Sequence, residues 1–400
     1  MTAVNYKPTL RACYLGYVTQ AVVNNLAPLL FALFQTDFSI PLEKIGQLIL
    51  LNFGTQLLVD LASVKLVDRL GYRFSACAAH LTSAVGLALL GLLPRLLPDP
   101  YLGLALAVMV CAVGGGLIEV LISPIVEALP GDAKASAMSL LHAFYCWGQV
   151  LVVLLSTLFL RIWPAAWPLL TALWGLLPLY NFSRFRRVPL APVIADGGGA
   201  MPLRELFSHR VFWLALLLMM CAGSSELAMS QWSSLFAERG LGVPKMLGDL
   251  LGPCLFALLM GAGRTLYGVF GERLPLKKLM AASSLFCVCC YLTTIFSPSP
   301  IISLLGCAAC GLSVSLLWPG TFSLSAAALP RGGTALFSLL ALAGDLGGAV
   351  GPWLAGLVSG HIAAGVGAEQ AGLRGGLLAV TVFPLLMLGG VLSFRRKKRR

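Results

Sequence analysis

The sequence predicts an all-α polytopic membrane protein, with twelve transmembrane helices in two pseudo-symmetric six-helix bundles. Two observations lead to this fold class. Apolar residues make up 58% of the 400 residues and charged residues only 11%, whereas soluble domains are about one quarter charged. Apolar stretches of about 20 residues recur along the whole chain, and each can cross a bilayer as a helix. A soluble protein is therefore excluded.

Polar breaks divide these stretches into the expected helices, each long enough to span about 30 Å of hydrocarbon at about 1.5 Å per residue. The first six are expected at 10–35, 43–67, 74–95, 101–128, 134–161 and 164–182. The second six are expected at 210–237, 246–270, 276–297, 299–328, 333–360 and 374–394. The predicted domains are an N-terminal bundle (1–182), a cytoplasmic linker (183–209), a C-terminal bundle (210–394) and a basic tail (395–400).

The distribution of charge predicts the orientation in the membrane. The formal net charge is +12, and 22 of the 28 lysine and arginine residues fall on one side of this topology. Because basic loops stay in the cytoplasm, we expect a multi-pass protein of the plasma (inner) membrane with both termini in the cytoplasm. The same segregation argues against nucleic acid as a partner. The tail Arg395–Arg400 is interpreted as a topology anchor.

An internal repeat supports two homologous bundles. Three short anchors recur at an offset of about 200 residues, each at the end or start of an expected helix. The paired anchors are 128–130 with 328–330, 139–141 with 338–340, and 68–69 with 272–273. Six helices repeated in the same orientation are the plan of one large transporter fold.

A loop motif narrows this to a family. The segment from Val64 to Arg73 resembles the motif Gly-x-Leu-x-Asp-Arg-x-Gly-Arg-Lys that the major facilitator superfamily carries between its second and third helices. The departures are Val64 for the leading glycine and Tyr72 for a basic residue. The resemblance implies that Asp68 lies near the start of the eleventh helix, where its carboxylate would meet a positive helix end and close the cytoplasmic side. Glu272 would do the same at the fifth helix.

Within the superfamily, the chain resembles the fucose:proton symporter branch. The resemblance is carried by Asn24 to Pro28 in the first helix, Glu119 in the fourth, and Leu140 to Tyr145 in the fifth. The first-helix acid of that branch is an amide here, so its proton-coupling role is not transferred.

Ionisable residues inside membrane segments cost about 3 kcal/mol each on insertion scales and are therefore functional candidates. The proton-coupling candidates are Glu119, Glu226 and His142, because burial favours a protonated carboxyl group and a neutral imidazole can relay protons. Arg264 needs a partner, either Glu119 or the carboxylate of an anionic substrate. A fixed ion pair, a hydrogen-bonded core acid and a structural histidine are the corresponding alternatives.

Two further groups of candidates follow from polar and aromatic residues in the expected helices. Amides bind hydroxyl groups and tryptophans stack on sugar rings, which gives the substrate-binding candidates Gln20, Asn24, Asn25, Trp147, Gln149, Gln231, Trp232 and Trp318. The candidates for gating or charge pairing are Asp60, Asp68, Arg69, Arg264, Glu272, Arg273 and Asp345. Asp345 lies in the glycine-rich segment 344–352, where close helix packing is the alternative.

No nucleotide-binding loop, dinucleotide fingerprint or hydrolase motif lies in a matching context, and the 11 cysteines lack metal-site spacing. We therefore expect no enzyme activity, no metal and no cofactor. We predict a secondary active transporter, a monomer in the lipid bilayer, that moves a small polar solute, preferably a sugar. The expected mechanism is symport with alternating access, driven by a proton gradient or by sodium. The alternatives are a proton-coupled exporter of drugs or metabolites, a transporter-like sensor, and a membrane enzyme or flippase.

Overall fold

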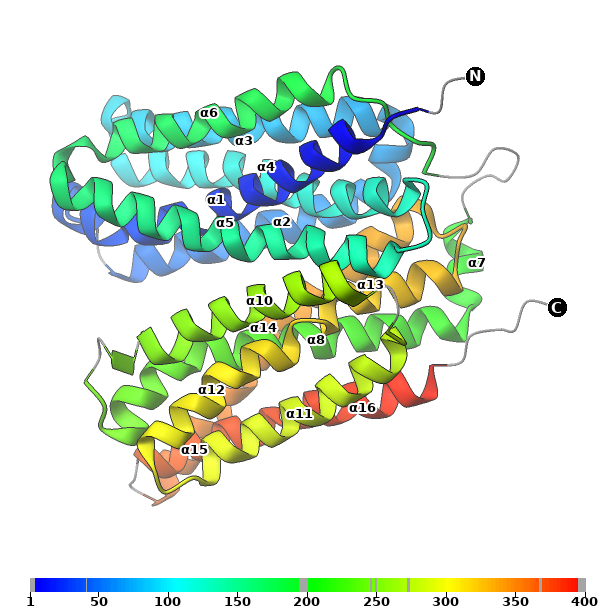
Figure 1. Cartoon of the computed structure of the whole chain (residues 1–400). Helices are drawn as coiled ribbons and strands as arrows, with labels where there is room; N and C mark the ends of the chain where they lie inside the picture. The colour runs from blue at the N-terminus through cyan, green and yellow to red at the C-terminus, as the bar shows by residue number, and fades with distance from the viewer. Residues whose placement is uncertain are drawn as a thin grey trace. The chain divides into compact units, whose positions relative to one another are not determined.

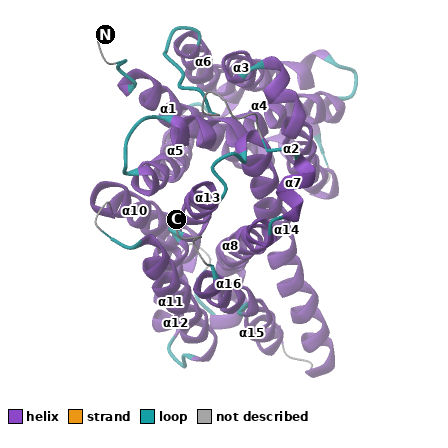
Figure 2. Cartoon of the chain, turned by 90° about the vertical axis from the view of Figure 1, so that its right-hand side faces the viewer, coloured by secondary structure: helices purple, strands orange, loops and turns teal. Residues whose placement is uncertain are grey.

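The computed structural model describes residues 4–40, 42–193, 201–244, 247–248, 250–271, 274–366 and 369–394. This part of the chain consists of helices and the loops between them (Figure 1; Figure 2). Ten of the described helical segments are long and apolar enough to cross a membrane. The all-helical fold class predicted from the sequence is therefore confirmed.

The first part of the chain follows the predicted order of helices closely. Its elements are α1 (Lys7–Phe38), α2 (Leu42–Leu70), α3 (Tyr72–Leu96), α4 (Pro100–Ala128), α5 (Lys134–Ile162), the short 3₁₀ helix η1 (Pro164–Ala166) and α6 (Trp167–Phe185). The start of α4 shows why the ends of these helices can be predicted from the sequence. Asp99 caps the helix by accepting from the Tyr101 N–H at 2.9 Å, and Pro100 occupies the first helical position, where its missing N–H costs nothing.

The second part of the chain is more interrupted. Its elements are α7 (Leu203–Ser208), α8 (Arg210–Leu235), the π-helices η2 (Phe236–Gly240) and η3 (Leu250–Cys254), α10 (Leu255–Phe270), α11 (Leu276–Phe296), α12 (Pro300–Val314), α13 (Leu317–Ala328), α14 (Gly333–Val366), α15 (Glu369–Val380) and α16 (Val382–Ser393). The short helix α7 lies inside the segment predicted as an irregular linker.

Two helices predicted as continuous are divided in the structure. The helix expected at 299–328 breaks into α12 and α13 around Ser315, and the helix expected at 374–394 begins earlier and breaks at Thr381. A proline follows each break by three or four residues: Pro319 and Pro384. Because proline has no N–H, the carbonyl four residues earlier loses its helical partner, and the helix is interrupted there.

The helices form two compact units. The first contains residues 1–132, 144–199 and 333–339, and the second contains 133–143, 200–332 and 340–400. Residues 133–143, which include the first ten residues of α5, thus group with the second unit, and the start of α14 groups with the first. The domain boundaries drawn from the sequence, at 182 and 210, stay a prediction.

The core of the first unit is an apolar layer between α1, α3, α4 and α6. Leu26, Leu30 and Phe34 of α1 are fully buried there, and Phe34 contacts Trp167 edge to face with ring centroids 5.3 Å apart. The backbones of α3 and α4 approach closely because Gly114 has no side chain. A Cβ atom at Gly114 would lie 2.2 Å from the Ser83 Oγ. The glycines in α4 therefore serve helix packing, as small residues do between membrane helices.

In the second unit, α8 packs backbone to backbone against α14. A Cβ atom at Gly347 would lie 2.0 Å from the Met220 carbonyl oxygen. The Ser224 Oγ donates a hydrogen bond to the Gly347 carbonyl at 2.8 Å, and the Trp232 Nε1 donates to the Pro352 carbonyl at 3.1 Å. The glycine-rich segment 344–352 therefore forms the contact surface that holds these two helices together.

Candidate substrate and proton sites

The first unit contains a row of amides beside a carboxylate, here called the amide cluster: Gln20, Asn24 and Asn25 of α1, Gln56 of α2 and Glu119 of α4. The Gln20 Nε2 donates to the Glu119 Oε2 at 2.7 Å, and the Gln56 Nε2 donates to the Asn24 Oδ1 at 2.8 Å. The Asn25 Nδ2 donates to the Ala21 carbonyl in its own helix at 2.8 Å. The cluster therefore joins three helices through hydrogen bonds that a hydroxylated solute could also make.

One buried atom of the amide cluster has no hydrogen-bond partner among the described residues, and a tyrosine of α5 borders the cluster. The buried atom is the Gln20 Oε1. The hydroxyl group of Tyr145, in α5, lies within hydrogen-bonding reach of both Asn24 and Asn25. A buried polar atom without a partner is costly, so the side of the cluster near Gln20 is a place where a bound group would be stabilised.

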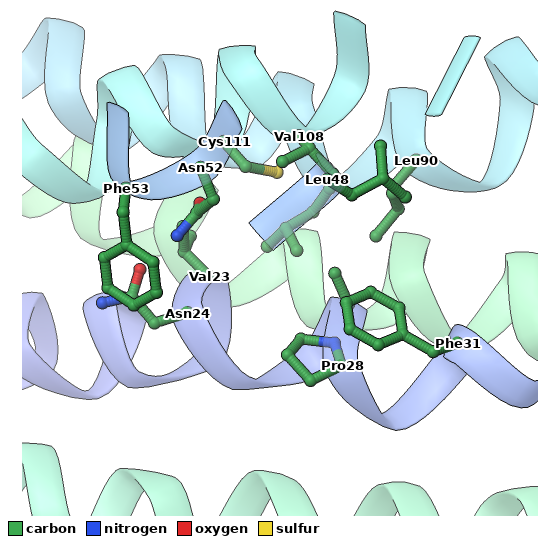
Figure 3. A pocket seen from close by; sticks show the side chains of 12 residues that line it. Val23, Asn24, Pro28, Phe31, Leu48, Asn52, Phe53, Leu90, Val108 and Cys111 are labelled. Carbon is green, nitrogen blue, oxygen red and sulfur yellow. The ribbon is translucent and has the colours of Figure 1, made fainter. Parts of the chain in front are cut away.

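A small cavity of about 40 Å³ adjoins Asn24 in the first unit. Figure 3 shows the side chains of Asn24, Asn52 and Phe53 at one end and those of Pro28 and Phe31 at the other. The cavity is large enough to hold water, which needs at least about 10–15 Å³. Asn52 was not predicted as a candidate; an amide within the second apolar stretch was the signal that could have found it.

The second unit contains an ion pair between α8 and α10. The Arg264 Nη2 lies 3.0 Å from the Glu226 Oε2, and the two side chains are 4% and 16% exposed. The Arg264 Nε donates to the Ser315 carbonyl at 3.1 Å. The sequence interpretation gave Arg264 either Glu119 or a substrate carboxylate as partner; the structure gives it Glu226, a pairing that was not predicted.

Two further polar residues near this ion pair come from α5. The Ser139 Oγ donates to the backbone carbonyl of Arg264 at 2.8 Å. His142 is buried, interacts electrostatically with Arg264, and stacks on Phe322 with ring centroids 5.8 Å apart. His142 and Glu226, two of the three proton-coupling candidates, therefore lie in the same unit, and both interact with Arg264.

The aromatic and amide candidates are divided between the two units. Trp232 hydrogen-bonds to Pro352 in the second unit, and Trp318 packs there against Gly344. Trp147 belongs to the first unit and is 40% exposed. Among the other candidates, Gln231 is exposed and Gln149 is half-buried. Of the eight substrate candidates, only Gln20, Asn24 and Asn25 belong to the amide cluster.

The gating candidate Asp68 lies in a small group of hydroxyl residues, here called the Asp68 cluster: Asp68, Tyr72 and Thr334. The Thr334 Oγ1, at the start of α14, donates to the Asp68 Oδ1 at 2.7 Å, and the Tyr72 hydroxyl lies 2.5 Å from the Thr334 Oγ1. A carboxylate only accepts hydrogen bonds, so the proton of Thr334 points to Asp68 and Tyr72 must donate to Thr334. Tyr72 thus takes part at the position where the family motif has a basic residue.

The other gating candidates do not belong to the Asp68 cluster. Arg69 is exposed at the end of α2, Asp60 is buried in α2, and Asp345 is half-buried in α14. Glu272, Arg273 and the tail Arg395–Arg400 lie outside the described residues. Thr334 was missed by sequence reasoning; its position between the repeated anchors at 328–330 and 338–340 was the available signal.

Comparison with known proteins gives the family. The model of the Major Facilitator Superfamily matches residues 13–352, whereas no curated protein sequence matches. Among solved structures, the E. coli fucose:proton symporter FucP is 16% identical with a TM-score of 0.80, over 98% of this chain and 100% of that one. The proton:xylose symporter XylE is 13% identical, with a TM-score of 0.79 and coverages of 96% and 94%. The human organic anion transporter MFSD10 (TETRAN) is 15% identical, with a TM-score of 0.70 and coverages of 97% and 99%.

These structural similarities show the shared fold, and the family match shows descent. The expectation drawn from the loop motif at Val64 to Arg73 is therefore confirmed. The chain belongs to the major facilitator superfamily and is a multi-pass membrane transporter.

Proposed function

We propose that this transporter moves a small polar solute, with a sugar as the favoured class, by proton-coupled symport with alternating access. The observation that carries this proposal is the amide cluster, in which a membrane-embedded carboxylate, Glu119, is hydrogen-bonded by Gln20 beside the Asn24–Gln56 pair. Amides exchange hydrogen bonds with hydroxyl groups, and a carboxylate among them can accept a proton. The similarity to two sugar:proton symporters points in the same direction.

The proposed topology has twelve spans, with both termini in the cytoplasm and the protein in the plasma (inner) membrane. Ten segments meet the length and hydropathy of a span. We add α1, whose hydropathy is lowered by Gln20, Asn24 and Asn25, and α6, which has only 19 residues and ends in polar ones. The excess of lysine and arginine on one side supports the orientation.

In the proposed cycle, a proton binds Glu119 or Glu226 on the side of higher proton concentration. Protonation of Glu119 turns the carboxylate from a pure acceptor into a group that can also donate. The Gln20 amide can then exchange its bond for one to a solute hydroxyl, so proton and solute stabilise the same state. The driving force is the proton gradient, with sodium as the alternative ion. We expect the transporter to act as a monomer without a cofactor.

The test is uptake of labelled sugars into proteoliposomes that contain the full chain, with and without an inward proton gradient. We expect gradient-driven accumulation, which Glu119→Gln or Glu226→Gln lowers at least tenfold. The matched control is Glu205→Gln, because Glu205 forms an exposed ion pair with Arg331 and belongs neither to the amide cluster nor to the Glu226–Arg264 pair. Unchanged proton coupling in both test variants would contradict the mechanism, and gradient-driven efflux would favour the exporter alternative.

A further inference from the structure

The Glu226–Arg264 pair is nearly closed off from water and carries no net charge. Its nitrogen and oxygen lie 3.0 Å apart, with 4% of the Arg264 side chain and 16% of the Glu226 side chain exposed. Removing one partner from a buried pair is strongly unfavourable, because the remaining charge loses both water and its counter-charge. When Glu226 is neutralised, Arg264 becomes a buried charge without a counter-charge, and another negative group beside it would be stabilising.

Arg264 is held in position independently of Glu226. Its Nε donates to the Ser315 carbonyl at 3.1 Å, and that carbonyl is available because Pro319, four residues later, has no N–H to bond it. The backbone carbonyl of Arg264 accepts from the Ser139 Oγ at 2.8 Å. Since a guanidinium group keeps its charge in proteins, the member of the pair that can change charge is Glu226.

Other titratable groups also lie around Glu226 and Arg264, but these two residues form the ion pair, with a nitrogen–oxygen distance of 3.0 Å. His142, at the start of α5, interacts electrostatically with Arg264, and the Tyr291 hydroxyl of α11 is engaged with the carbonyl of Ser225 at 2.9 Å. Other ionisable groups on the described helices around α8 and α10 include Arg204 and Glu205 (α7), Cys254 (η3), Cys307 and Cys310 (α12), Asp345 and His361 (α14) and Arg374 (α15).

We propose that the solute carries a carboxylate, which takes the place of Glu226 on Arg264 when Glu226 binds a proton. This inference rests on the proposed proton-coupled transport and specifies its substrate as a hydroxylated acid, such as a sugar acid. The guanidinium fork matches a carboxylate with parallel hydrogen bonds. One proton passes from water to the Glu226 carboxylate and one anion binds Arg264, so the charge of the site is the same before and after.

Charge balance separates this mechanism from symport of a neutral sugar. One proton moving with one anion transfers no net charge, so the membrane potential does not drive it. One proton moving with a neutral sugar transfers one positive charge, and a potential that is negative inside drives uptake. The two mechanisms therefore respond to different forces in the same vesicles.

The experiment compares matched acids and neutral sugars in proteoliposomes: D-glucuronate with D-glucose, and D-galacturonate with D-galactose. Each is tested with a pH gradient at zero potential, and with a potassium–valinomycin potential at equal pH. We expect an acid to accumulate at least tenfold more than its neutral partner under the pH gradient, with no response to the potential.

The outcomes separate the inference from the function on which it rests. Accumulation of the neutral sugars, but not the acids, would overturn the inference and leave proton-coupled sugar transport intact. Accumulation of an acid that follows the membrane potential would also overturn it. If neither acids nor neutral sugars accumulate under either force, both proposals fail.

Variants of the pair test the assigned roles. Glu226→Gln should keep exchange of labelled acid across the membrane but lose accumulation under the pH gradient at least tenfold. Arg264→Gln should lose both. Because a lone buried Glu226 could prevent folding, the double variant Glu226→Gln/Arg264→Gln removes both charges; acid transport that persists in it would overturn the inference. The control pair Glu205→Gln/Arg331→Gln removes an exposed ion pair of 2.7 Å and should leave acid transport unchanged.

Discussion

Asn181 is predicted to contribute measurably to stability, because it joins three helices of the first unit in a fully buried position. Its Nδ2 donates to the Ala12 carbonyl of α1 at 2.9 Å and contacts the His80 Nε2 of α3 at 2.8 Å. The His80 Nδ1 lies 2.8 Å from the Ala76 carbonyl and must donate to it. The His80 Nε2 is therefore an acceptor in a neutral ring, and Asn181 is its donor.

The size of the effect follows from what Asn181→Leu leaves behind. The His80 Nε2 becomes a buried acceptor without a partner, which costs about 1–3 kcal/mol, and the Ala12 carbonyl loses a second bond worth about 1 kcal/mol. The Asn181 Oδ1 has no partner among the described residues, so removing this buried polar atom stabilises the folded state by about 1 kcal/mol. We expect a net loss of about 1–3 kcal/mol in the free energy of unfolding.

The assay is unfolding by SDS in mixed micelles, followed by circular dichroism, with a double-mutant cycle between positions 181 and 80. Asn181→Leu combined with His80→Leu should cost less than the sum of the two single changes by at least about 1 kcal/mol, because neither buried polar group remains. Ser183→Ala is the control, since Ser183 is exposed on the same helix. A coupling energy within about 0.3 kcal/mol of zero would refute the assigned hydrogen bonds.

Two further changes test the Asp68 cluster and the packing of α8 on α14. Thr334→Val removes both hydrogen bonds that link Asp68, Thr334 and Tyr72, whereas Tyr72→Phe removes one. We therefore expect the free energy of unfolding to fall by about 2 kcal/mol and about 1 kcal/mol, respectively, in the same assay. Equal losses would contradict the assignment in which Tyr72 donates to Thr334 and Thr334 donates to Asp68. Gly347→Ala places a Cβ atom 2.0 Å from a carbonyl oxygen, whereas Gly360→Ala meets nothing within 4 Å. Folded yield by size-exclusion chromatography should fall at least fivefold for the first variant and stay unchanged for the second; similar yields would argue against tight packing here.

Helix positions were largely predictable because apolar stretches and their end signals are local properties of the sequence. The expected helix at 101–128 differs from α4 by one residue, since Asp99 and Pro100 mark its start. The breaks at Ser315 and Thr381 were not predicted, because an uninterrupted apolar stretch reads as one helix. Pro319 and Pro384 were the available signals, but a proline within a membrane helix often leaves it continuous, and only the surrounding contacts decide.

The site was predictable by residue type but not by pairing. Depth along a helix can be estimated from the chain, and it suggested Glu119 as the partner of Arg264. Which residues face each other depends on helix rotation and neighbours, and the structure pairs Glu119 with Gln20 and Arg264 with Glu226. Thr334 was overlooked for the same reason: its importance comes from the carboxylate across from it rather than from its own helix.

The ion pair shows how a local irregularity can determine where a buried charge is stable. A guanidinium group inside a membrane protein needs acceptors, and a carbonyl without a helical N–H partner has both of its lone pairs available, whereas a carbonyl in a regular helix has one already bonded. Pro319 frees the Ser315 carbonyl by lacking an N–H, and that carbonyl accepts from the Arg264 Nε. Glu226 then needs to satisfy only one edge of the guanidinium group. The Arg264 Nε is held by the Ser315 carbonyl, which does not titrate. When Glu226 loses its charge, the guanidinium edge that faced Glu226 can therefore bind another group while the side chain of Arg264 stays in place.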